Sequence, residues 1–152
     1  MRYLSTRWSI IGFLTPSWIE FKEHLKTNEV SLPCIVKPNA QGSTFGLSLV
    51  EKAKDLRAAI LRSQKFDKST LIEDYIYGKE ITVGVIEESP MPIVEILPKN
   101  RIYDYKCKYT AGMSEYNCPA EINDQISEKI MSDSVKIFQL LGSRGYGRID
   151  FR

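Results

Sequence analysis

Short stretches in which apolar residues cluster or alternate with polar ones predict a series of β-strands. Runs bounded by proline, glycine or charged residues predict strands over residues 32–38, 47–50, 70–76, 80–87 and 93–97. The tyrosine-rich segment 102–109 is predicted as a further strand. The loop over 110–122 that follows is long for a compact domain, which is typical of a functional or mobile segment.

The final segment, GYGRIDFR, predicts one more strand, in which Ile149 and Phe151 alternate with polar residues. Such a strand should have a neighbour beyond Arg152, so we expect the chain to be a piece of a larger protein. Arg148 and Asp150 project together from the opposite face of this strand. They form either a surface ion pair or a functional pair, in which the carboxylate holds Mg²⁺ and the guanidinium stabilises an oxyanion.

Apolar residues at helical spacing predict helices between these strands. One helix covers residues 51–64, and another runs from the N-cap Asn123 to Leu141, where Gly142 is placed to end it. The side chains expected to face the core are Ala53, Leu56, Ile60 and Leu61 in the first helix and Ile126, Ile130, Ile137, Phe138 and Leu141 in the second.

The N-terminal region, residues 1–32, is predicted as a helical lead-in. Its helices are expected over 6–12 and over 17–26, the second capped by Ser17.

Composition and charge narrow the function classes. A chain of 152 residues with 43% hydrophobic and 26% charged residues can bury the core of an ordinary domain. Its net charge of +2 and pI near 8.4 do not indicate nucleic acid or an anionic membrane as a partner. No apolar run is long enough to span a bilayer, and no cleavable signal is evident at the N-terminus. We therefore expect a cytoplasmic protein with neither nucleic acid nor a membrane as its partner.

Three cysteines, Cys34, Cys107 and Cys118, could join His24 as four ligands of a zinc ion. Structural zinc sites use short CxxC-type spacings, however, and the sequence contains none. Free thiols in a reducing compartment are the expected state of these cysteines.

A glycine-containing loop over 39–46 follows the strand that carries Lys37. Gly42 and Gly46 bracket Ser43 and Thr44, so small side chains and backbone N–H groups could close over phosphate oxygens. The Gly-Lys-Ser/Thr ending of a P-loop is absent, so the cation would come from the preceding strand. The alternative is a solvated lysine at a strand end followed by a hairpin turn.

Further polar residues suggest a nucleotide site. The segment 73–76 places backbone donors and acceptors at a strand end, which suits an adenine edge, and Glu80 could accept hydrogen bonds from ribose hydroxyls. Taken alone, Glu73 and Glu80 are more typical of solvated strand residues. Lys106, Lys108 and Tyr109 offer further cations and a phenol, or else form a basic edge strand that resists aggregation.

Four segments occur in an order and spacing that resemble the ATP-grasp part of D-alanine–D-alanine ligases. They are IVKPNAQGSTFGLSLV, LIEDYIYGKEITVGVI, YDYKCKYTAG with CPAEI, and RGYGRIDF. The resemblance extends from about Thr6 to Arg152. It implies an α+β ATP-grasp lobe with a mostly antiparallel sheet and flanking helices. The implied division is a lead-in over 1–32, a central lobe over 33–98 and the start of an incomplete C-terminal lobe over 99–152.

The resemblance assigns most candidates to nucleotide binding. Lys37 and Lys108 resemble phosphate-contacting lysines, and residues 41–46 resemble a phosphate lid. The segment 73–76 resembles the adenine-binding hinge, and Glu80 the ribose ligand. The residues expected to contact the nucleotide are Lys37, Gln41, Gly42, Ser43, Thr44, Glu73, Asp74, Tyr75, Ile76, Glu80 and Lys108.

The remaining roles concern the reaction. Ser43 and Tyr109 resemble a hydrogen-bonded pair over the second substrate site, and a tyrosine there resembles dipeptide-forming members of the family. Arg148 resembles the oxyanion-stabilising arginine, and Asp150 the first ligand of Mg²⁺ or Mn²⁺. The implied reaction joins two D-alanines for peptidoglycan synthesis. ATP first phosphorylates one carboxylate, and the amine of the second D-alanine then displaces phosphate.

Parts of the family pattern are missing from this sequence. They are the N-terminal domain that binds the first D-alanine and the glutamate and asparagine that complete the metal site. The fragment alone is therefore expected to be inactive, whereas the full-length enzyme is expected to be an active homodimer. Two alternatives stay open, namely another ATP-grasp carboxylate–amine ligase and a non-catalytic remnant that binds nucleotide weakly.

Overall fold

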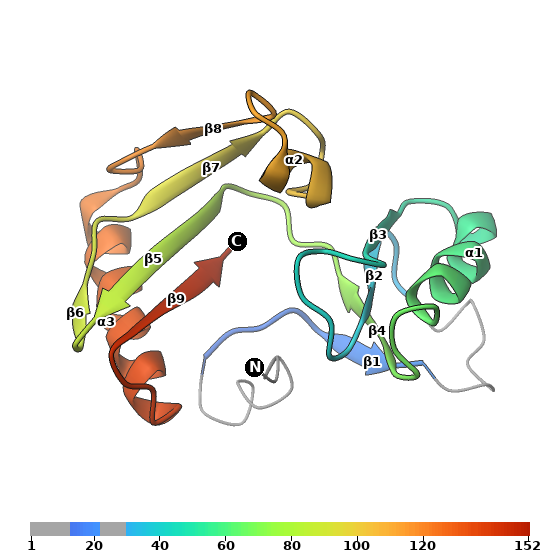
Figure 1. Ribbon diagram of the computed structural model, residues 1–152, viewed down its shortest axis with the longest axis horizontal. Helices are drawn as coiled ribbons and strands as arrows, with labels where there is room; N and C mark the ends of the chain where they lie inside the picture. Colours follow the sequence, from blue (N-terminus) through green and yellow to red (C-terminus); the bar gives the residue numbers. More distant parts are fainter. Residues whose placement is uncertain (1–12, 22–29) are drawn as a thin grey trace. The chain divides into compact units, whose positions relative to one another are not determined.

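The computed structural model describes residues 13–21 and 30–152. These residues form two compact units (Figure 1). Unit 1 is drawn from Met1–Ile76 and Ile102–Tyr109, and unit 2 consists of Tyr77–Arg101 and Thr110–Arg152. Unit 2 is thus interrupted in sequence by a short segment that packs within unit 1.

Unit 1 contains a four-stranded antiparallel sheet in the order β1-β4-β2-β3. Its strands are β1 (Trp18–Glu20), β2 (Cys34–Pro38), β3 (Ser48–Val50) and β4 (Thr70–Asp74). The strands predicted over 32–38, 47–50 and 70–76 are confirmed, each slightly shorter than predicted.

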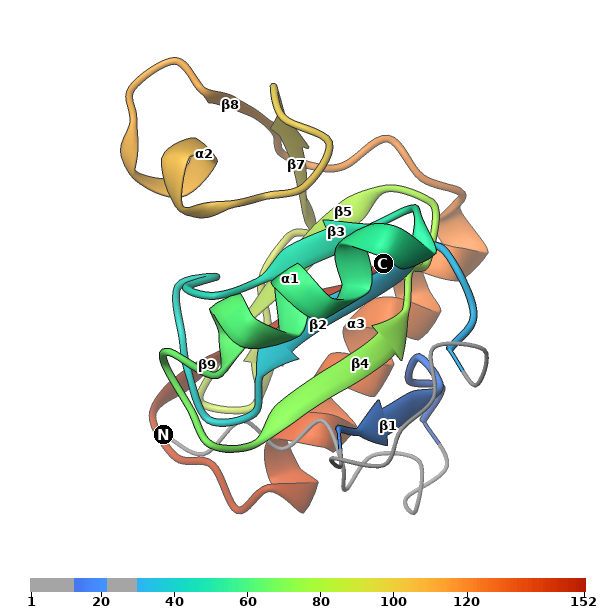
Figure 2. The same cartoon turned by 90° about the vertical axis from the view of Figure 1, so that its right-hand side faces the viewer.

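Helix α1 (Ala53–Ser63) packs against this sheet and closes the core of unit 1 (Figure 2). The core consists of Cys34, Val36, Val50, Leu56, Ala59, Ile60 and Ile72. The predicted helix over 51–64 is confirmed, with Leu56 and Ile60 inward. The predicted burial of Ala53 and Leu61 is wrong. Both side chains are exposed, Leu61 at 55%, because the buried face of the helix is completed by Ala59 and Ser63 instead.

The helix predicted over 17–26 is wrong for Trp18–Glu20, which form strand β1 at the edge of the sheet. Backbone pairing explains the difference, because the edge of β4 satisfies this segment's hydrogen-bonding groups. The Ser17 carbonyl accepts from the Asp74 N–H, and the Phe21 N–H donates to the Thr70 carbonyl. The predicted helix over 6–12 lies outside the described residues, as do residues 22–29.

Unit 2 is built on a second antiparallel sheet. Its strands are β5 (Glu80–Ile86), β6 (Ser89–Pro90), β7 (Val94–Pro98), β8 (Ser114–Asn117) and β9 (Tyr146–Phe151). The order is β6-β5-β7-β8, with β9 paired to β5 along its length. The predicted loop over 110–122 contains β8, a strand that sequence reasoning missed because its mostly exposed residues, SEYN, show no apolar alternation.

Helix α3 (Asp124–Leu140) packs against the apolar face of this second sheet, where it covers Ile81, Val83 and Ile93. The predicted cap is confirmed, because the Asn123 side chain accepts hydrogen bonds from the N–H groups of Gln125 and Ile126. Gly142, at φ +61°, follows the end of the helix as predicted.

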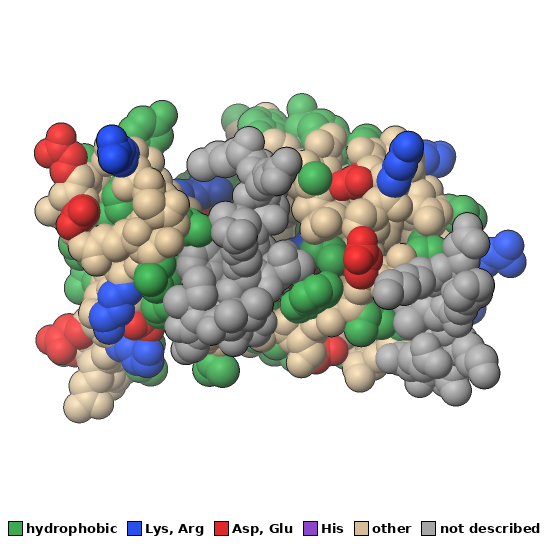
Figure 3. Space-filling view, turned by 90° about the horizontal axis from the view of Figure 1, so that it is seen from below, with side chains coloured by type: hydrophobic (Ala, Val, Ile, Leu, Met, Phe, Trp, Pro, Cys, Tyr) green, Lys and Arg blue, Asp and Glu red, His purple; other side chains and the backbone are tan. Residues whose placement is uncertain are grey.

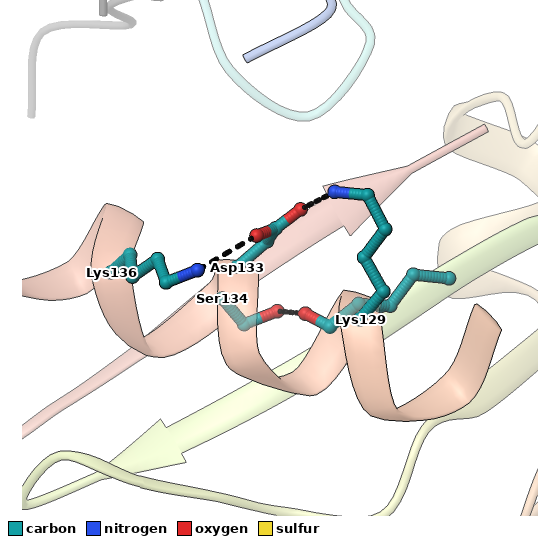
Figure 4. A network of polar contacts seen from close by, with 5 residues as sticks. Lys129, Asp133, Ser134 and Lys136 are labelled. Carbon is teal, nitrogen blue, oxygen red and sulfur yellow. Dashed lines mark hydrogen bonds and ion pairs between the residues drawn. The ribbon is translucent and has the colours of Figure 1, made fainter. Parts of the chain in front are cut away.

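The inward face of α3 was predicted only in part. Ile137 and Phe138 are buried and Ile130 packs on the core. Ile126, in the first turn, and Leu141, at the C-cap, are 53% and 40% exposed. Elsewhere on α3, Asp133 contacts both Lys129 and Lys136, as Figure 4 shows.

The strand predicted over 102–109 is wrong. Residues Tyr105–Tyr109 instead form the short helix α2, which belongs to unit 1. Asp104 nucleates the turn, since its side chain accepts a hydrogen bond of 2.9 Å from the Cys107 N–H and its carbonyl accepts from the Lys108 N–H. The alternative of a basic edge strand at Lys106 and Lys108 is therefore also wrong.

The remaining features concern the charge of the surface and the length of the helices. On the face seen in Figure 3, acidic and basic side chains are interspersed and neither sign forms a continuous patch. Across residues 13–21 and 30–152, no helix combines the length and apolar character needed to cross a bilayer.

Candidate nucleotide and catalytic site

The loop that follows β2 is anchored at its base in unit 1. The Asn39 N–H donates to the Ser69 carbonyl, and the Ala40 N–H donates to the Asp67 carboxylate at 2.7 Å. Asp67 also accepts from the Ser69 N–H, so one carboxylate ties the start of the loop to the turn before β4. This anchoring fixes where the glycine-containing part of the loop begins.

The centre of the loop adopts a strained backbone. Ser43 and Thr44 have φ values of 55° and 59°, in the left-handed region that residues with a Cβ atom avoid. The Phe45 N–H donates to the Gly42 carbonyl across this turn, and the Leu47 N–H donates to the Thr44 carbonyl. Each left-handed residue costs about 1–2 kcal/mol, so other contacts must hold the turn in place.

Gly46 is required by the same turn. Its φ is +73°, and a Cβ atom there would lie 2.7 Å from the Phe66 ring and 2.9 Å from the Pro38 ring. The glycine therefore allows the loop to lie directly against these two side chains.

Ser43 and Tyr109 are brought together, as the resemblance predicted. The Ser43 Oγ and the Tyr109 Oη lie 3.0 Å apart, although 66 residues separate them in sequence. Helix α2 positions the phenol, and the strained turn positions the serine. The contact attaches the glycine-containing loop to α2.

Lys37 and Glu73 form a partly buried ion pair of 2.7 Å, with 27% and 14% of their side chains exposed. They are diagonal neighbours on β2 and β4, because Lys37 lies opposite Leu71 and Glu73 lies opposite Ile35. Two candidate nucleotide ligands thus lie side by side on one face of the sheet of unit 1. A second lysine of this unit, Lys108, lies over the Tyr103 ring at 5.1 Å.

The candidate hinge, residues 73–76, lies at the end of the first of the two segments of unit 1. Within it, the Asp74 N–H donates to the Ser17 carbonyl at 2.9 Å and the Tyr75 N–H to the Pro33 carbonyl at 3.2 Å. These two donors hold the segment in place within the unit. Other backbone groups of the segment would have to contact an adenine edge.

Arg148 and Asp150 form the centre of a polar group on the exposed face of the sheet of unit 2. The Arg148 Nε lies 2.9 Å from the Asp150 Oδ1, and its Nη2 lies 3.1 Å from Oδ2. Both side chains are about 60% exposed, at 60% and 59%. The two side chains therefore contact each other on the exposed face of the sheet.

Glu80 and Thr82 extend the same polar face along β5. The Thr82 hydroxyl donates to the Asp150 Oδ1 at 2.7 Å, and Glu80 accepts from the Arg152 guanidinium at 2.8 Å. The alternation of β5 and β9 separates these polar side chains from Ile81, Val83 and Phe151, which pack with α3.

The donor chemistry around Asp150 can contribute to a magnesium site but cannot complete one. Among the residues the structure describes, no group of three or more histidine, cysteine, aspartate or glutamate side chains could hold a metal ion. A single carboxylate suits Mg²⁺ when phosphate oxygens and water fill the other positions. Arg148 contacts both oxygens of Asp150, so its guanidinium would have to move for a cation to bind there.

The sequence matches a known protein family. The family model described as "D-ala D-ala ligase C-terminus" matches residues 11–152. The chain belongs to this family. Its curated relatives include a D-alanine–D-alanine ligase of Aquifex aeolicus, 37% identical over 145 residues, with 93% of this chain and 49% of the relative covered. Another, from Halalkalibacterium halodurans, is 42% identical over 123 residues, with 78% and 40% covered. The chain thus spans about half the length of the curated relatives it matches.

Solved structures show the same relationship. A D-alanine–D-alanine ligase from Bacillus anthracis matches 96% of this chain and 50% of its own length, with a TM-score of 0.80 and 28% identity. A structure of that enzyme complexed with ATP covers 97% and 49%, with a TM-score of 0.75 and 27% identity. The VanG D-Ala:D-Ser ligase from Enterococcus faecalis covers 93% and 44%, with a TM-score of 0.74 and 27% identity. The predicted fold class, an α+β ATP-grasp lobe with mostly antiparallel sheets, is confirmed.

Sequence reasoning missed several residues that shape the site of this D-alanine–D-alanine ligase family member. Phe45, Phe66 and Tyr105 form ring contacts beside the glycine-containing loop, and Thr82 orients Asp150. A large aromatic residue inside an otherwise small and polar loop was the available signal for Phe45. For Thr82, the signal was its place between Glu80 and Gly84 on the polar face of an alternating strand.

The three cysteines of the family member form no disulfide. Cys34 and Cys107 are buried and Cys118 is exposed, while His24, the fourth residue of the zinc hypothesis, lies outside the described residues. Burial, with a smaller effect from the negative charge of Asp74, raises the pKa of the Cys34 thiol from 9.0 to about 11. Cys34 is therefore a protonated core residue at neutral pH.

Proposed function

We propose that the chain supplies part of the ATP-binding and catalytic region of an ATP-dependent D-alanine–D-alanine ligase. The full-length enzyme would act in the cytoplasm, where it makes D-alanyl-D-alanine for peptidoglycan precursors. The observation that carries the proposal is the hydrogen bond of 3.0 Å between Ser43 and Tyr109. Nothing local in the sequence requires this contact, whereas a loop that closes over the reacting groups does require it.

Unit 1 would bind the nucleotide. Lys37 and Lys108 carry positive charge that would offset the charge of the phosphates, and the N–H groups of the loop 41–46 would approach the phosphate oxygens. The pairing of Lys37 with Glu73 would hold the ammonium in place before the nucleotide arrives. The hinge, residues 73–76, would contact the adenine edge. Closure of the loop would also exclude water, which hydrolyses an acyl phosphate.

Residues of unit 2 would contact the ribose and the reacting carboxyl group. Glu80 would accept hydrogen bonds from the ribose, and Arg148 would stabilise the oxyanion formed when the amine attacks. A bound Mg²⁺ or Mn²⁺ ion would neutralise part of the negative charge of the phosphates. We assign Asp150 as the carboxylate that would hold this ion. Arg148 would leave Asp150 when it takes up its role at the oxyanion.

The rest of the catalytic machinery would come from the remainder of a full-length enzyme. This includes the site for the first D-alanine, the other metal ligands and the surfaces of a homodimer. We expect the isolated chain to form no dipeptide when incubated with ATP, Mg²⁺ and D-alanine. Formation of D-alanyl-D-alanine by the isolated chain would contradict this part of the proposal.

Isothermal titration of the chain with ATP in the presence of Mg²⁺ tests the nucleotide site. We expect the native chain to bind and Lys37→Ala to weaken binding about tenfold or more, as expected for loss of a charge-assisted contact to phosphate. Lys54→Ala is the matched control, because Lys54 is an exposed residue of α1 and alanine suits a helix. Absence of binding by the native chain, or equal weakening by both variants, would contradict the proposed site.

A further inference from the structure

Four aromatic side chains form a continuous row beside the glycine-containing loop. Phe45 from the loop stacks on Phe66 at a centroid distance of 5.9 Å and meets Tyr105 of α2 at 4.7 Å. Tyr105 in turn meets Tyr109 at 4.6 Å. All four rings are partly exposed, from 39% for Phe45 to 61% for Tyr109, so the hydrophobic core of unit 1 does not hold them in place.

The row connects the loop to α2 at two points. The Phe45 ring contacts Tyr105, and two residues earlier the Ser43 hydroxyl contacts the Tyr109 hydroxyl. Tyr105 and Tyr109 lie one helical turn apart and contact each other, so both attachments are made to the same short helix. Phe66, in the turn that follows α1, also contacts the Phe45 ring.

The backbone between the two attachments needs this support. Ser43 and Thr44 both have positive φ values, and neither is glycine. A hydrogen bond between two exposed hydroxyl groups is weak, because water competes for both partners. Ring contacts in offset or tilted geometry add a stabilisation that water does not replace. The aromatic contacts therefore add to the hydrogen bond in holding the turn.

We propose that Phe45 is a positioning residue. Its ring, which contacts both Phe66 and Tyr105, fixes the strained turn in the conformation that places Ser43 against Tyr109. The inference rests on the proposed function only for what the Ser43–Tyr109 pair does in catalysis. The positioning itself depends only on side chains of this chain.

Hydrogen exchange of the nucleotide-free chain tests this directly. The N–H groups of residues 45 and 47 are the reporters, because they donate to the Gly42 and Thr44 carbonyls within the turn. We expect Phe45→Leu, which keeps an apolar side chain but removes the ring, to accelerate exchange at both reporters about tenfold. Phe45→Tyr keeps the ring and should retain the native rate. Leu61→Ala, at an exposed apolar residue of α1 outside the row, is the control and should leave the reporters unchanged.

A double-mutant comparison separates positioning from general stabilisation. Tyr109→Phe removes only the hydroxyl that contacts Ser43, and we expect it to accelerate the reporter at residue 45 in the native background. In the Phe45→Leu background it should have no further effect, since the serine is no longer placed against the phenol.

Three outcomes would overturn the inference. The first is an unchanged exchange rate at both reporters in Phe45→Leu. The second is an equal acceleration of exchange at the N–H groups of β2 and β4 in that variant. The third is that the effects of Phe45→Leu and Tyr109→Phe on the reporter at residue 45 are additive. None of these outcomes depends on ATP binding. A chain that shows the expected exchange pattern but binds no nucleotide would contradict the proposed function and leave the positioning role of Phe45 intact.

Discussion

Thr82 lies directly opposite Asp150 in the β5–β9 ladder, and its hydroxyl donates a hydrogen bond of 2.7 Å to the Asp150 Oδ1. The same oxygen lies 2.9 Å from the Arg148 Nε. Two neighbours within one sheet therefore set the direction of the carboxylate that we assign to the metal ion. A strand provides a rigid base for such an arrangement, because its side chains alternate between fixed faces.

The hydroxyl of Thr82 should contribute measurably to the stability of unit 2. We expect Thr82→Val to lower the free energy of unfolding by about 1 kcal/mol, because it removes a hydrogen bond to a charged group on an exposed face. Thr82→Ser retains the hydroxyl and should have a smaller effect. Urea denaturation measures both changes, with Thr110→Val at an exposed loop position as the control. Equal stabilities of Thr82→Val and the native chain would show that the hydrogen bond contributes nothing.

Lys37 and Glu73 should be coupled more strongly than an exposed ion pair. The two carboxylates are similarly shielded, at 14% exposed for Glu73 and 15% for Asp133, but Lys37 is 27% exposed whereas Lys129, the partner of Asp133 in α3, is 73% exposed. A double-mutant cycle with Lys37→Met and Glu73→Gln should give a coupling energy of about 1–2 kcal/mol, because either single change leaves a partly buried group without its partner.

The corresponding cycle at the helical pair, with Lys129→Met and Asp133→Asn, should give about 0.3–0.5 kcal/mol. Chemical denaturation provides all the required free energies. Similar coupling energies at the two sites would mean that the sheet does not shield the Lys37–Glu73 pair from solvent.

Elements whose local signals agreed were predictable from the sequence. In α3, a capping residue, an apolar face and a terminal glycine all favour the same helix, and the structure has it. In α2, the tyrosines favour a strand, but the Asp104 side chain caps a helical turn instead. In β1, the apolar residues are spaced as in a helix, but the segment forms a strand because its backbone pairs with the edge of β4. Local propensity fails where one hydrogen bond or one sheet edge decides the conformation.

Long-range contacts of the candidate site could not be derived from spacing. Ser43 and Tyr109 are 66 residues apart, and only the family resemblance paired them before the structure was known. Neither spacing nor resemblance indicated the row of rings through Phe45, because ring packing depends on where α2 and the turn after α1 lie in space. The chemistry of a site is visible in residue types, whereas its support depends on tertiary structure.

The Cys34 thiol should make stability depend on alkaline pH. Burial and the charge of Asp74 raise its pKa in the folded chain to about 11, from 9.0. Because the folded pKa is raised, the stabilisation is fully present below pH 9.0 and is lost as the pH rises towards 11, where the unfolded chain releases the proton first. The native chain should therefore lose stability relative to Cys34→Val over this range, as measured by urea denaturation at each pH. Cys118→Ala, at the exposed cysteine, should show no such relative change.

The hairpin between β5 and β6 offers a way to stabilise unit 2. Glu87 and Glu88 form its two-residue turn with φ values of 46° and 66°, as in a type I′ turn, which favours asparagine and glycine. We expect Glu87→Gly to raise the free energy of unfolding by about 1 kcal/mol, because glycine adopts positive φ without steric strain. The Glu87 N–H, which donates to the Gly145 carbonyl at 2.8 Å, is retained in this variant.

A matched substitution distinguishes relief of strain from loss of a negative charge. Glu128→Gly removes the same charge from an exposed position in the middle of α3, where glycine should lower the free energy of unfolding by about 1 kcal/mol. The two variants should therefore move in opposite directions in the same denaturation experiment. If both destabilise the chain, the positive φ at Glu87 carries no strain, and the entropy that glycine adds to the unfolded chain decides the outcome.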